Sequence, residues 1–270
     1  MGDVGKTIRL NRILRGPGRG SLVVAFDHAL VLGPIPGTEN PIQQIRQFAD
    51  ASVDGILLNL GLLRHCAESL SPGRTPGIIA RIDWTTVWNS LSEGAGGVLR
   101  SCMLATPEEA LRHGADAVLT YMVVGTGDAD FEAKEVERNA RVARECEQIG
   151  IPLIVETLAR GKGVENPGDS KWLKLHTRMA AELGADVIKT DYAGSVEVMR
   201  SVVEECPIPI LVLGGSRNEA ALDVVRGVVE SGAAGVFFGR NVFQADDMLA
   251  FLRKARAVLD HADARVLAQS

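Results

Sequence analysis

A single lysine closes an apolar run in Val187-Ile188-Lys189-Thr190 and could act as a nucleophile. An ordinary lysine has a pKa of about 10.4, so little of its amine is neutral at pH 7. Apolar surroundings and a nearby cation, such as Arg81 or Arg160, would lower that pKa towards roughly 7–8. A neutral amine attacks a ketone and forms a Schiff base, which withdraws electrons while a carbon–carbon bond breaks or forms. The alternative is a lysine that ends a strand and reaches solvent.

Asp27, in Phe26-Asp27-His28, is the second candidate for chemistry. Its carboxylate could position a substrate hydroxyl, or move a proton while the carbinolamine forms and loses water. His28 comes next in the sequence, and alternation along a strand predicts that its side chain points the other way. For His28 we therefore favour packing over catalysis.

Two glycine-bearing segments, Gly214-Gly215-Ser216-Arg217 and Gly239-Arg240, could hold a phosphate group. Glycine lets backbone N–H groups come close to an anion, and arginine offers a fork of donors to phosphate oxygens. Either segment alone could be only a turn. Because both follow apolar runs that we interpret as strands, we expect them to form one phosphate site for a phosphorylated small-molecule substrate.

These residues are carried by a regular alternation of short apolar runs and segments with helical periodicity. The predicted strands are residues 21–27, 55–59, 77–83, 116–124, 152–158, 186–190, 208–213 and 235–238. The predicted helices include residues 131–149, 170–183, 218–230 and 246–260. Such alternation predicts a single (β/α)8 TIM barrel domain spanning residues 1–270, with a doubly wound open sheet as the alternative. No Gly-x-Gly-x-x-Gly turn follows the first run, which favours the barrel.

Charged residues gather at the ends of the predicted strands. In a barrel, alternate strand residues point inward, and active sites form at the carboxyl ends of the strands. A charged side chain that faced the helices would lose its solvation without a partner, so we expect these residues to point into the barrel mouth. The set comprises Asp27, Arg81, Asp83, Glu156, Arg160, Lys189 and Asp191. Opposite charges that meet in this way are typical of an active site.

Composition narrows the class of protein. The 270-residue chain is 46% apolar and has a net charge of −5, which argues against nucleic-acid binding because there is no basic surplus to neutralise phosphates. No signal-peptide pattern and no apolar run of roughly 18 residues indicate export or a membrane partner. The cysteines, at positions 66, 102, 146 and 206, lack metal-ligand spacing. We therefore expect a cytoplasmic protein with reduced thiols and no metal site.

Several segments, taken together, resemble the archaeal-type class I fructose-bisphosphate aldolases. This DeoC/LacD-like family also includes aminodideoxyheptulosonate synthase and the autoinducer-2 phospho-dione thiolase. The segments that carry the resemblance are Phe26-Asp27-His28, Ala159-Arg160-Gly161-Lys162, residues 184–190, Gly214-Gly215 and residues 239–244. The resemblance implies that Lys189 forms the Schiff base, that Asp27 is the catalytic aspartate, and that the glycines and Arg240 bind phosphate. It also implies a homo-oligomer, either a decamer built from rings of five or a pentamer, without metal or cofactor.

The chain departs from this family at one position that matters for proton transfer. Sugar-phosphate aldolases of the family usually carry a tyrosine two residues before the Arg-Gly pair, where this chain has Leu158. Glu156 lies on the same face of that strand and could replace the missing acid if burial raises its pKa. A salt bridge to Arg81 or Arg160 is its alternative role. Tyr121 is another candidate donor, although packing is the more typical role of a strand tyrosine.

We therefore expect a class I aldolase that acts reversibly on a phosphorylated ketone or sugar phosphate such as dihydroxyacetone phosphate. Lys189, Asp27 and Glu156 would be catalytic. The residues expected to bind the substrate and its phosphate are Gly214, Gly215, Ser216, Arg217, Gly239, Arg240, Arg160 and Arg81. Two alternatives remain open: acyl transfer from a phosphorylated diketone to coenzyme A through the same lysine, and a protein that binds a phosphorylated ligand without turnover. The sequence leaves the aldehyde partner undecided.

Overall fold

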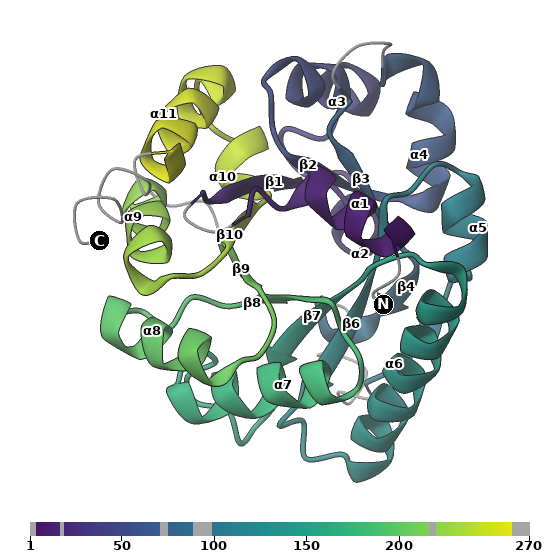
Figure 1. The fold of residues 1–270 in the computed structure, drawn as a ribbon, viewed down its shortest axis with the longest axis vertical. Coiled ribbons are helices and arrows are strands. Elements are labelled where there is room, and N and C mark those ends of the chain that lie inside the picture. The colour runs from purple at the N-terminus through teal and green to yellow at the C-terminus, as the bar shows by residue number, and fades with distance from the viewer. Residues whose placement is uncertain (1–3, 17–18, 71–74, 89–98, 216–219, 261–270) are drawn as a thin grey trace.

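Eight parallel strands close into a barrel at the centre of the molecule (Figure 1). The computed structural model describes residues 4–16, 19–70, 75–88, 99–215 and 220–260. Neighbouring strands follow the order β1-β10-β9-β8-β7-β6-β3-β2. The strands are β1 (Ser21–Ala25), β2 (Gly55–Asn59), β3 (Gly77–Arg81), β6 (Ala117–Val124), β7 (Leu153–Ala159), β8 (Val187–Thr190), β9 (Ile210–Leu213) and β10 (Gly235–Phe238). The predicted (β/α)8 barrel is confirmed, and the open-sheet alternative is wrong.

Helices surround the barrel and cover its outer face, except for the first, which lies across one end of the barrel (Figure 1). They are α1 (Val4–Ile13), α2 (Ala29–Leu32), α3 (Pro41–Asp50), α4 (Leu60–Cys66), α5 (Pro107–Arg112), α6 (Ala129–Ile149), α7 (Ser170–Glu182), α8 (Val196–Glu205), α9 (Ala221–Ser231), α10 (Arg240–Phe243) and α11 (Met248–Asp260). A short 3-10 helix, η1 (Ala67–Ser69), follows α4. A second one, η2 (Thr86–Trp88), follows the first strand of a hairpin that lies outside the barrel sheet. The helices predicted from periodicity correspond to α6, α7, α9 and α11.

That hairpin, formed by the antiparallel strands β4 (Asp83–Thr85) and β5 (Ser101–Met103), is a separate two-stranded sheet that packs against β6. The sequence placed Asp83 at the end of the third barrel strand, but β3 ends two residues earlier and Asp83 begins β4. Similarly, β1 ends before Asp27, which we had assigned to that strand. Both differences place a charged residue beyond the end of its barrel strand, where the alternation of faces along that strand no longer decides its direction.

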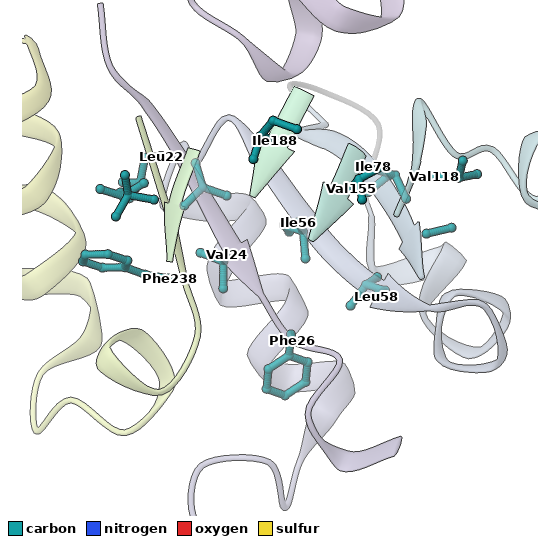
Figure 2. Close-up of a cluster of buried hydrophobic side chains, with 14 of the residues drawn as sticks. Leu22, Val24, Phe26, Ile56, Leu58, Ile78, Val118, Val155, Ile188 and Phe238 are labelled. Atoms are coloured by element: carbon teal, nitrogen blue, oxygen red, sulfur yellow. The ribbon is translucent and has the colours of Figure 1, made fainter. Parts of the chain in front are cut away.

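Two layers of buried side chains hold the barrel together. The interior is filled by Val23, Ala25, Leu57, Ile79, Ala117, Leu119, Ile154, Val187, Leu211 and Phe237, with Ile13 of α1 packed among them. A larger cluster lies between the strands and the helices, and Figure 2 shows part of it, including Leu22 and Val24. Along β1, inward and outward residues therefore alternate, as the sequence predicted.

The amino-terminal end of the barrel is closed by α1 and the residues that follow it. Three aspartates that precede or begin strands accept a backbone N–H of the neighbouring strand and pair with a cation from this segment. Asp54 accepts hydrogen bonds from Leu22 N (2.8 Å) and Arg15 Nε (2.8 Å). Asp116 accepts hydrogen bonds from Ile78 N (3.0 Å) and from Arg12. Asp186 accepts a hydrogen bond from Leu153 N (2.8 Å), and its carboxylate lies 3.1 Å from Lys6 Nζ. Because this end is plugged, the carboxyl ends of the strands are the end left for a site.

Among the residues that the structure describes, no helix combines the length and the apolar character needed to cross a membrane. The described His, Cys, Asp and Glu side chains form no group of three that could hold a metal ion. All four cysteines are free thiols; Cys66 and Cys146 are buried, whereas Cys102 is exposed.

Candidate active site

A cavity of about 360 Å³ lies at the carboxyl ends of the barrel strands. Most of the residues that the sequence singled out line it, namely Asp27, Glu156, Arg160, Lys189, Gly214, Gly215, Gly239 and Arg240. Arg81 lies beneath it and bonds to two of its carboxylates. Ser216 and Arg217, which we expected to bind phosphate, lie outside the described residues. The fold therefore brings together predicted residues that are up to 213 positions apart, from Asp27 to Arg240.

Lys189 points into the barrel from β8, opposite Glu156 of β7 in the strand register. Its Nζ lies 2.9 Å from Glu156 Oε2 and 4.7 Å from the centre of the Phe237 ring, and the residue is 5% exposed. We had expected a neighbouring cation to free the amine of its proton. The direct partner is instead the Glu156 carboxylate, which is the nearest group that could exchange a proton with Lys189 during a reaction.

Arg81, at the end of β3, joins the carboxylates around this lysine. Its Nε donates to Asp27 Oδ2, its Nη2 donates to Glu156 Oε2, and its Nη1 lies 3.3 Å from Asp83 Oδ1. The guanidinium also lies 3.7 Å from the centre of the Tyr121 ring. The salt bridge between Glu156 and Arg81, which we gave as an alternative role for Glu156, is thus present. The three donor groups of Arg81 thus hold three carboxylates in place. That Arg81 also binds phosphate stays a prediction.

Asp27 lies on the turn after β1 and is almost fully buried. Burial by itself raises the pKa of Asp27, but the charges of Arg81 and Lys189 oppose this and bring the pKa well below its ordinary value. Asp27 is therefore ionised at neutral pH. An ionised carboxylate in a cavity wall is suited to accept a hydrogen bond from a substrate hydroxyl.

His28 lines the same cavity, and the prediction that it points away is wrong. The reason is that β1 has already ended, so the chain turns into α2 and carries both Asp27 and His28 to the cavity. His28 Nδ1 lies 3.6 Å from Asp27 Oδ1, and burial lowers the pKa of His28, which keeps the imidazole neutral at pH 7. Sequence reasoning missed this residue because it relied on strand alternation.

Leu158 occupies the position where sugar-phosphate aldolases of the resembled family carry a tyrosine, and Tyr121 lies next to it. Leu158 is fully buried and packs against Tyr121, Val123 and Phe131. Tyr121 lines the cavity, and burial raises its pKa well above the ordinary value, so that its hydroxyl stays protonated at neutral pH. The acid–base groups nearest to Lys189 are therefore carboxylates.

The side of the cavity after β9 and β10 is built for close approach to the backbone. Gly215 has a φ of 64°, a left-handed conformation that glycine adopts without strain. A Cβ on Gly239 would lie 2.3 Å from His28 Cε1, so any side chain there would collide with the imidazole. Arg240 follows, its Nε has no hydrogen-bond partner, and burial lowers its pKa without a carboxylate to oppose the effect. Within the described part of the chain, this cation is left without a counter-ion.

Arg160, by contrast, is already paired with a carboxylate, that of Asp191. Its Nη1 lies 2.9 Å from Asp191 Oδ2 and its Nη2 lies 3.3 Å from Asp191 Oδ1, a fork-shaped pair of hydrogen bonds between the ends of β7 and β8. Nη1 also donates to the Ala159 carbonyl oxygen at 2.8 Å. Phosphate binding by Arg160 stays a prediction, and the structure adds that a carboxylate already holds this guanidinium.

A buried network behind Arg81 was missed by the sequence analysis. Asp83 is fully buried and accepts hydrogen bonds from Tyr121 N (2.7 Å) and from Arg138 of α6. Arg138 Nη2 also donates to Tyr121 O (2.7 Å) and to Glu135 Oε1 (2.7 Å). The network fixes the hairpin, β6 and α6 against one another, and thereby fixes the position of Arg81.

Comparison with known proteins adds to this geometry. The sequence matches the family described as DeoC/LacD family aldolase over residues 21–245, a span that contains all eight barrel strands. An uncharacterized aldolase of Saccharolobus solfataricus is 35% identical over 254 residues, which cover 90% of each chain. The 2-amino-4,5-dihydroxy-6-oxo-7-(phosphonooxy)heptanoate synthase of Streptomyces griseus is 31% identical, and the match covers 98% of this chain and 94% of that protein.

The fold also resembles solved structures. One is an archaeal fructose-1,6-bisphosphate aldolase whose catalytic lysine is covalently bound to the carbinolamine intermediate of the substrate. It matches with a TM-score of 0.82 and 29% sequence identity, covering 94% of this chain and 99% of that chain. The resemblance that the motifs indicated is therefore confirmed.

Proposed function

The chain belongs to the DeoC/LacD family of aldolases, and we propose that Lys189 carries its reaction through a Schiff base with a phosphorylated ketone such as dihydroxyacetone phosphate. The observation that supports this assignment most directly is the contact of 2.9 Å between Lys189 Nζ and Glu156 Oε2. It supplies a buried amine with an acceptor for its proton.

Imine formation begins when the Lys189 ammonium passes one proton to Glu156 Oε2 and becomes a neutral amine. Nζ then attacks the ketone carbon, and one proton moves from the attacking nitrogen to the carbonyl oxygen, which becomes the hydroxyl of a neutral carbinolamine. Glu156 returns its proton to that hydroxyl, which leaves as water, and the C=N bond of the iminium forms. Glu156 ends this stage as a carboxylate, held in place by Arg81.

Cleavage or formation of the carbon–carbon bond follows from the iminium. In the cleavage direction, a hydroxyl on the substrate loses its proton, an aldehyde leaves, and the bonding electrons move to the iminium nitrogen to give an enamine. The Glu156 carboxylate is the base in this proposal, because Leu158 cannot carry a proton. Asp27, ionised by its surroundings, orients the hydroxyl by accepting a hydrogen bond from it.

The phosphate is proposed to bind beside Gly214, Gly215 and Gly239, next to Arg240. The absence of side chains on the glycines lets an anion approach backbone N–H groups, and the guanidinium of Arg240 has no counter-ion among the described residues. Ser216 and Arg217 follow Gly215 in the sequence and would complete this site. The substrate is thereby held at its phosphate end and attacked at its ketone carbon.

Borohydride reduction in the presence of dihydroxyacetone phosphate tests the proposal. We expect a stable adduct on the peptide that contains Lys189, seen by mass spectrometry, and none in Lys189→Met. Lys174→Met is the matched control, because Lys174 lies on the outer surface of α7 and pairs with Glu205. An adduct on a different lysine, or full aldolase activity in Lys189→Met, would overturn the assignment. A product that forms only with coenzyme A would favour acyl transfer instead.

We also propose that the enzyme is a cytoplasmic homo-oligomer of five or ten subunits that works without a metal ion or organic cofactor. Light scattering coupled to gel filtration measures the subunit number. Activity that survives extensive treatment with a chelator is the result expected for the absence of a metal requirement.

A further inference from the structure

The charges that line the cavity indicate how many phosphate groups it can hold, an inference that rests on the proposed aldolase function. Lys189, Glu156 and Asp27 belong to the reaction itself. Two guanidinium groups among the described residues then remain on the cavity wall, those of Arg160 and Arg240. Hydrogen bonds from a cation are the strongest that a phosphate dianion can receive, and a cation already paired with a carboxylate offers less, so the partners of these two arginines are compared.

Arg240 meets this requirement. It stands directly after Gly239, its buried Nε has no hydrogen-bond partner, and burial lowers its pKa with no opposing effect from a carboxylate of the described residues. A desolvated cation without a counter-ion is a costly arrangement for an empty cavity. The binding of one phosphate would relieve that cost.

Arg160 does not meet the requirement. Both of its terminal nitrogens face Asp191, at 2.9 and 3.3 Å, and the two side chains are only 23% and 18% exposed. A second phosphate at Arg160 would have to displace Asp191 or lie against its negative charge. Fork-shaped pairs of this kind are among the stronger charge-assisted hydrogen bonds in proteins, so displacement is unfavourable.

We propose that this aldolase is selective for substrates with a single phosphate, and that Asp191 excludes ketose bisphosphates by neutralising Arg160. The ketone component carries its phosphate to Arg240, and the aldehyde component carries none. Close to the cavity, Val31 and Leu32 of α2 add apolar surface, which offers nothing to a second anion. Asp191 is in this view a specificity residue, since it acts on the second phosphate group without taking part in bond making.

Protection of Lys189 from trapping measures this selectivity without knowledge of the aldehyde partner. Imine formation with dihydroxyacetone phosphate and borohydride is followed in the presence of hexitol 1-phosphate or hexitol 1,6-bisphosphate, two linear competitors that differ by one phosphate. In the wild type we expect the monophosphate to protect at a concentration at least tenfold lower than the bisphosphate. Protection by the bisphosphate at an equal or lower concentration, or by neither competitor, would overturn the proposal.

Two variants locate the cause. Asp191→Asn releases Arg160, so we expect its protection by the bisphosphate to improve at least tenfold relative to the monophosphate. The double variant Arg160→Gln/Asp191→Asn removes the pair without changing the net charge, and its preference should stay within about threefold of the wild type. A tenfold loss of bisphosphate protection in the double variant would identify Arg160 as a phosphate ligand and overturn the inference.

Failure of the proposed function has a different signature. If dihydroxyacetone phosphate gives no adduct on Lys189 in the wild type, the Schiff-base mechanism fails before any competitor is added. If the adduct forms but the two competitors protect equally, the mechanism stands and the single-phosphate proposal falls.

Discussion

Replacement of Arg81 by methionine removes the cation that holds the buried carboxylates together. Methionine fills a similar length of the space beside Tyr121 but cannot donate a hydrogen bond. Asp83 keeps Arg138 and the Tyr121 N–H, and Glu156 keeps Lys189. Asp27 loses most, because Arg81 is its direct ion-pair partner, and what remains is the charge of Lys189 and the neutral imidazole of His28 at 3.6 Å.

The size of the effect follows from burial. Arg81 is 2% exposed, and the removal of one partner from a buried ion pair typically costs about 3–5 kcal/mol, because the other charge is left uncompensated. For a domain of this size, 1 kcal/mol corresponds to about 2–4 °C in melting temperature, so we expect Arg81→Met to melt roughly 6–20 °C lower at pH 7.

The difference should also depend on pH, with a definite sign. The folded protein holds the pKa of Asp27 well below that of an unfolded chain, about 3.9, so Asp27 stabilises the fold at neutral pH. That contribution disappears as the pH falls through the folded-state value. Protonation of Asp27 removes this advantage of the wild type and also relieves the uncompensated buried charge of Arg81→Met, so the gap in melting temperature should be widest at pH 7 and should narrow as the pH falls, most of all below about pH 4.

Thermal unfolding followed by circular dichroism at pH 7, 5, 4 and 3 measures both quantities. Arg112→Met is the control, since Arg112 forms an exposed pair with Glu108 on α5, and its melting temperature should stay within about 2 °C of the wild type. The reasoning is refuted if Arg81→Met melts like that control, or if its deficit is unchanged or larger at pH 3.

Three further outcomes are expected. Gly239→Ala places a Cβ 2.3 Å from His28 Cε1 and should lower kcat/KM at least tenfold by moving the imidazole; unchanged kinetics would contradict the close packing. Burial lowers the pKa of His176 to about 3, so between about pH 6.5 and pH 3 the imidazole takes up a proton in the unfolded chain but not in the folded protein. This difference destabilises the wild type as the pH falls. In denaturant titrations, His176→Leu should therefore lose about 2 kcal/mol less free energy of unfolding than the wild type between pH 7 and pH 5. In the native protein a thiol reagent should modify exposed Cys102 quickly, whereas Cys146, whose pKa burial raises to about 12, should react only after unfolding.

The barrel could be predicted because its signal is local and repeated. Each strand is a short apolar run between polar turns, and β2 and β10 have the bounds that the sequence assigned. Alternation within a strand then correctly assigned Val23 and Ala25 to the interior. Because all parallel strands end on one side of a barrel, the same reasoning placed Lys189, Glu156 and Arg240 around one cavity.

The missed features depend on contacts between distant residues. Strands β4 and β5 have three residues each, which is too short to show a period in the sequence. They pair Asp83 with Met103, and the sequence does not reveal a pairing between segments so far apart. Glu135 and Arg138 are three residues apart on a helix, a spacing typical of solvent-exposed pairs. They are buried because Arg138 reaches Asp83, 55 positions earlier in the chain. Such a partner becomes visible only when the fold brings the two segments together.

The exchange of a tyrosine at position 158 for an acid at position 156 changes which step that acid can assist. Two strand residues correspond to roughly 7 Å, so the acid lies deeper in the barrel, level with Lys189 in the register of β7 and β8. At that depth Glu156 contacts the amine of Lys189, whereas the position nearer the cavity mouth is taken by the apolar side chain of Leu158. We therefore expect Glu156→Gln to slow Schiff-base formation itself, by about 100-fold in the rate of borohydride trapping.

A tyrosine restored at position 158 should not rescue this loss. Glu156→Gln/Leu158→Tyr has an acid above the substrate but none beside the amine, so its trapping rate should equal that of the single variant. Rapid-quench measurement of the adduct separates this step from carbon–carbon cleavage. If Glu156→Gln formed the imine at the wild-type rate and failed only in cleavage, Glu156 would act on the substrate hydroxyl alone, and the proton transfer from Lys189 would have to follow another route.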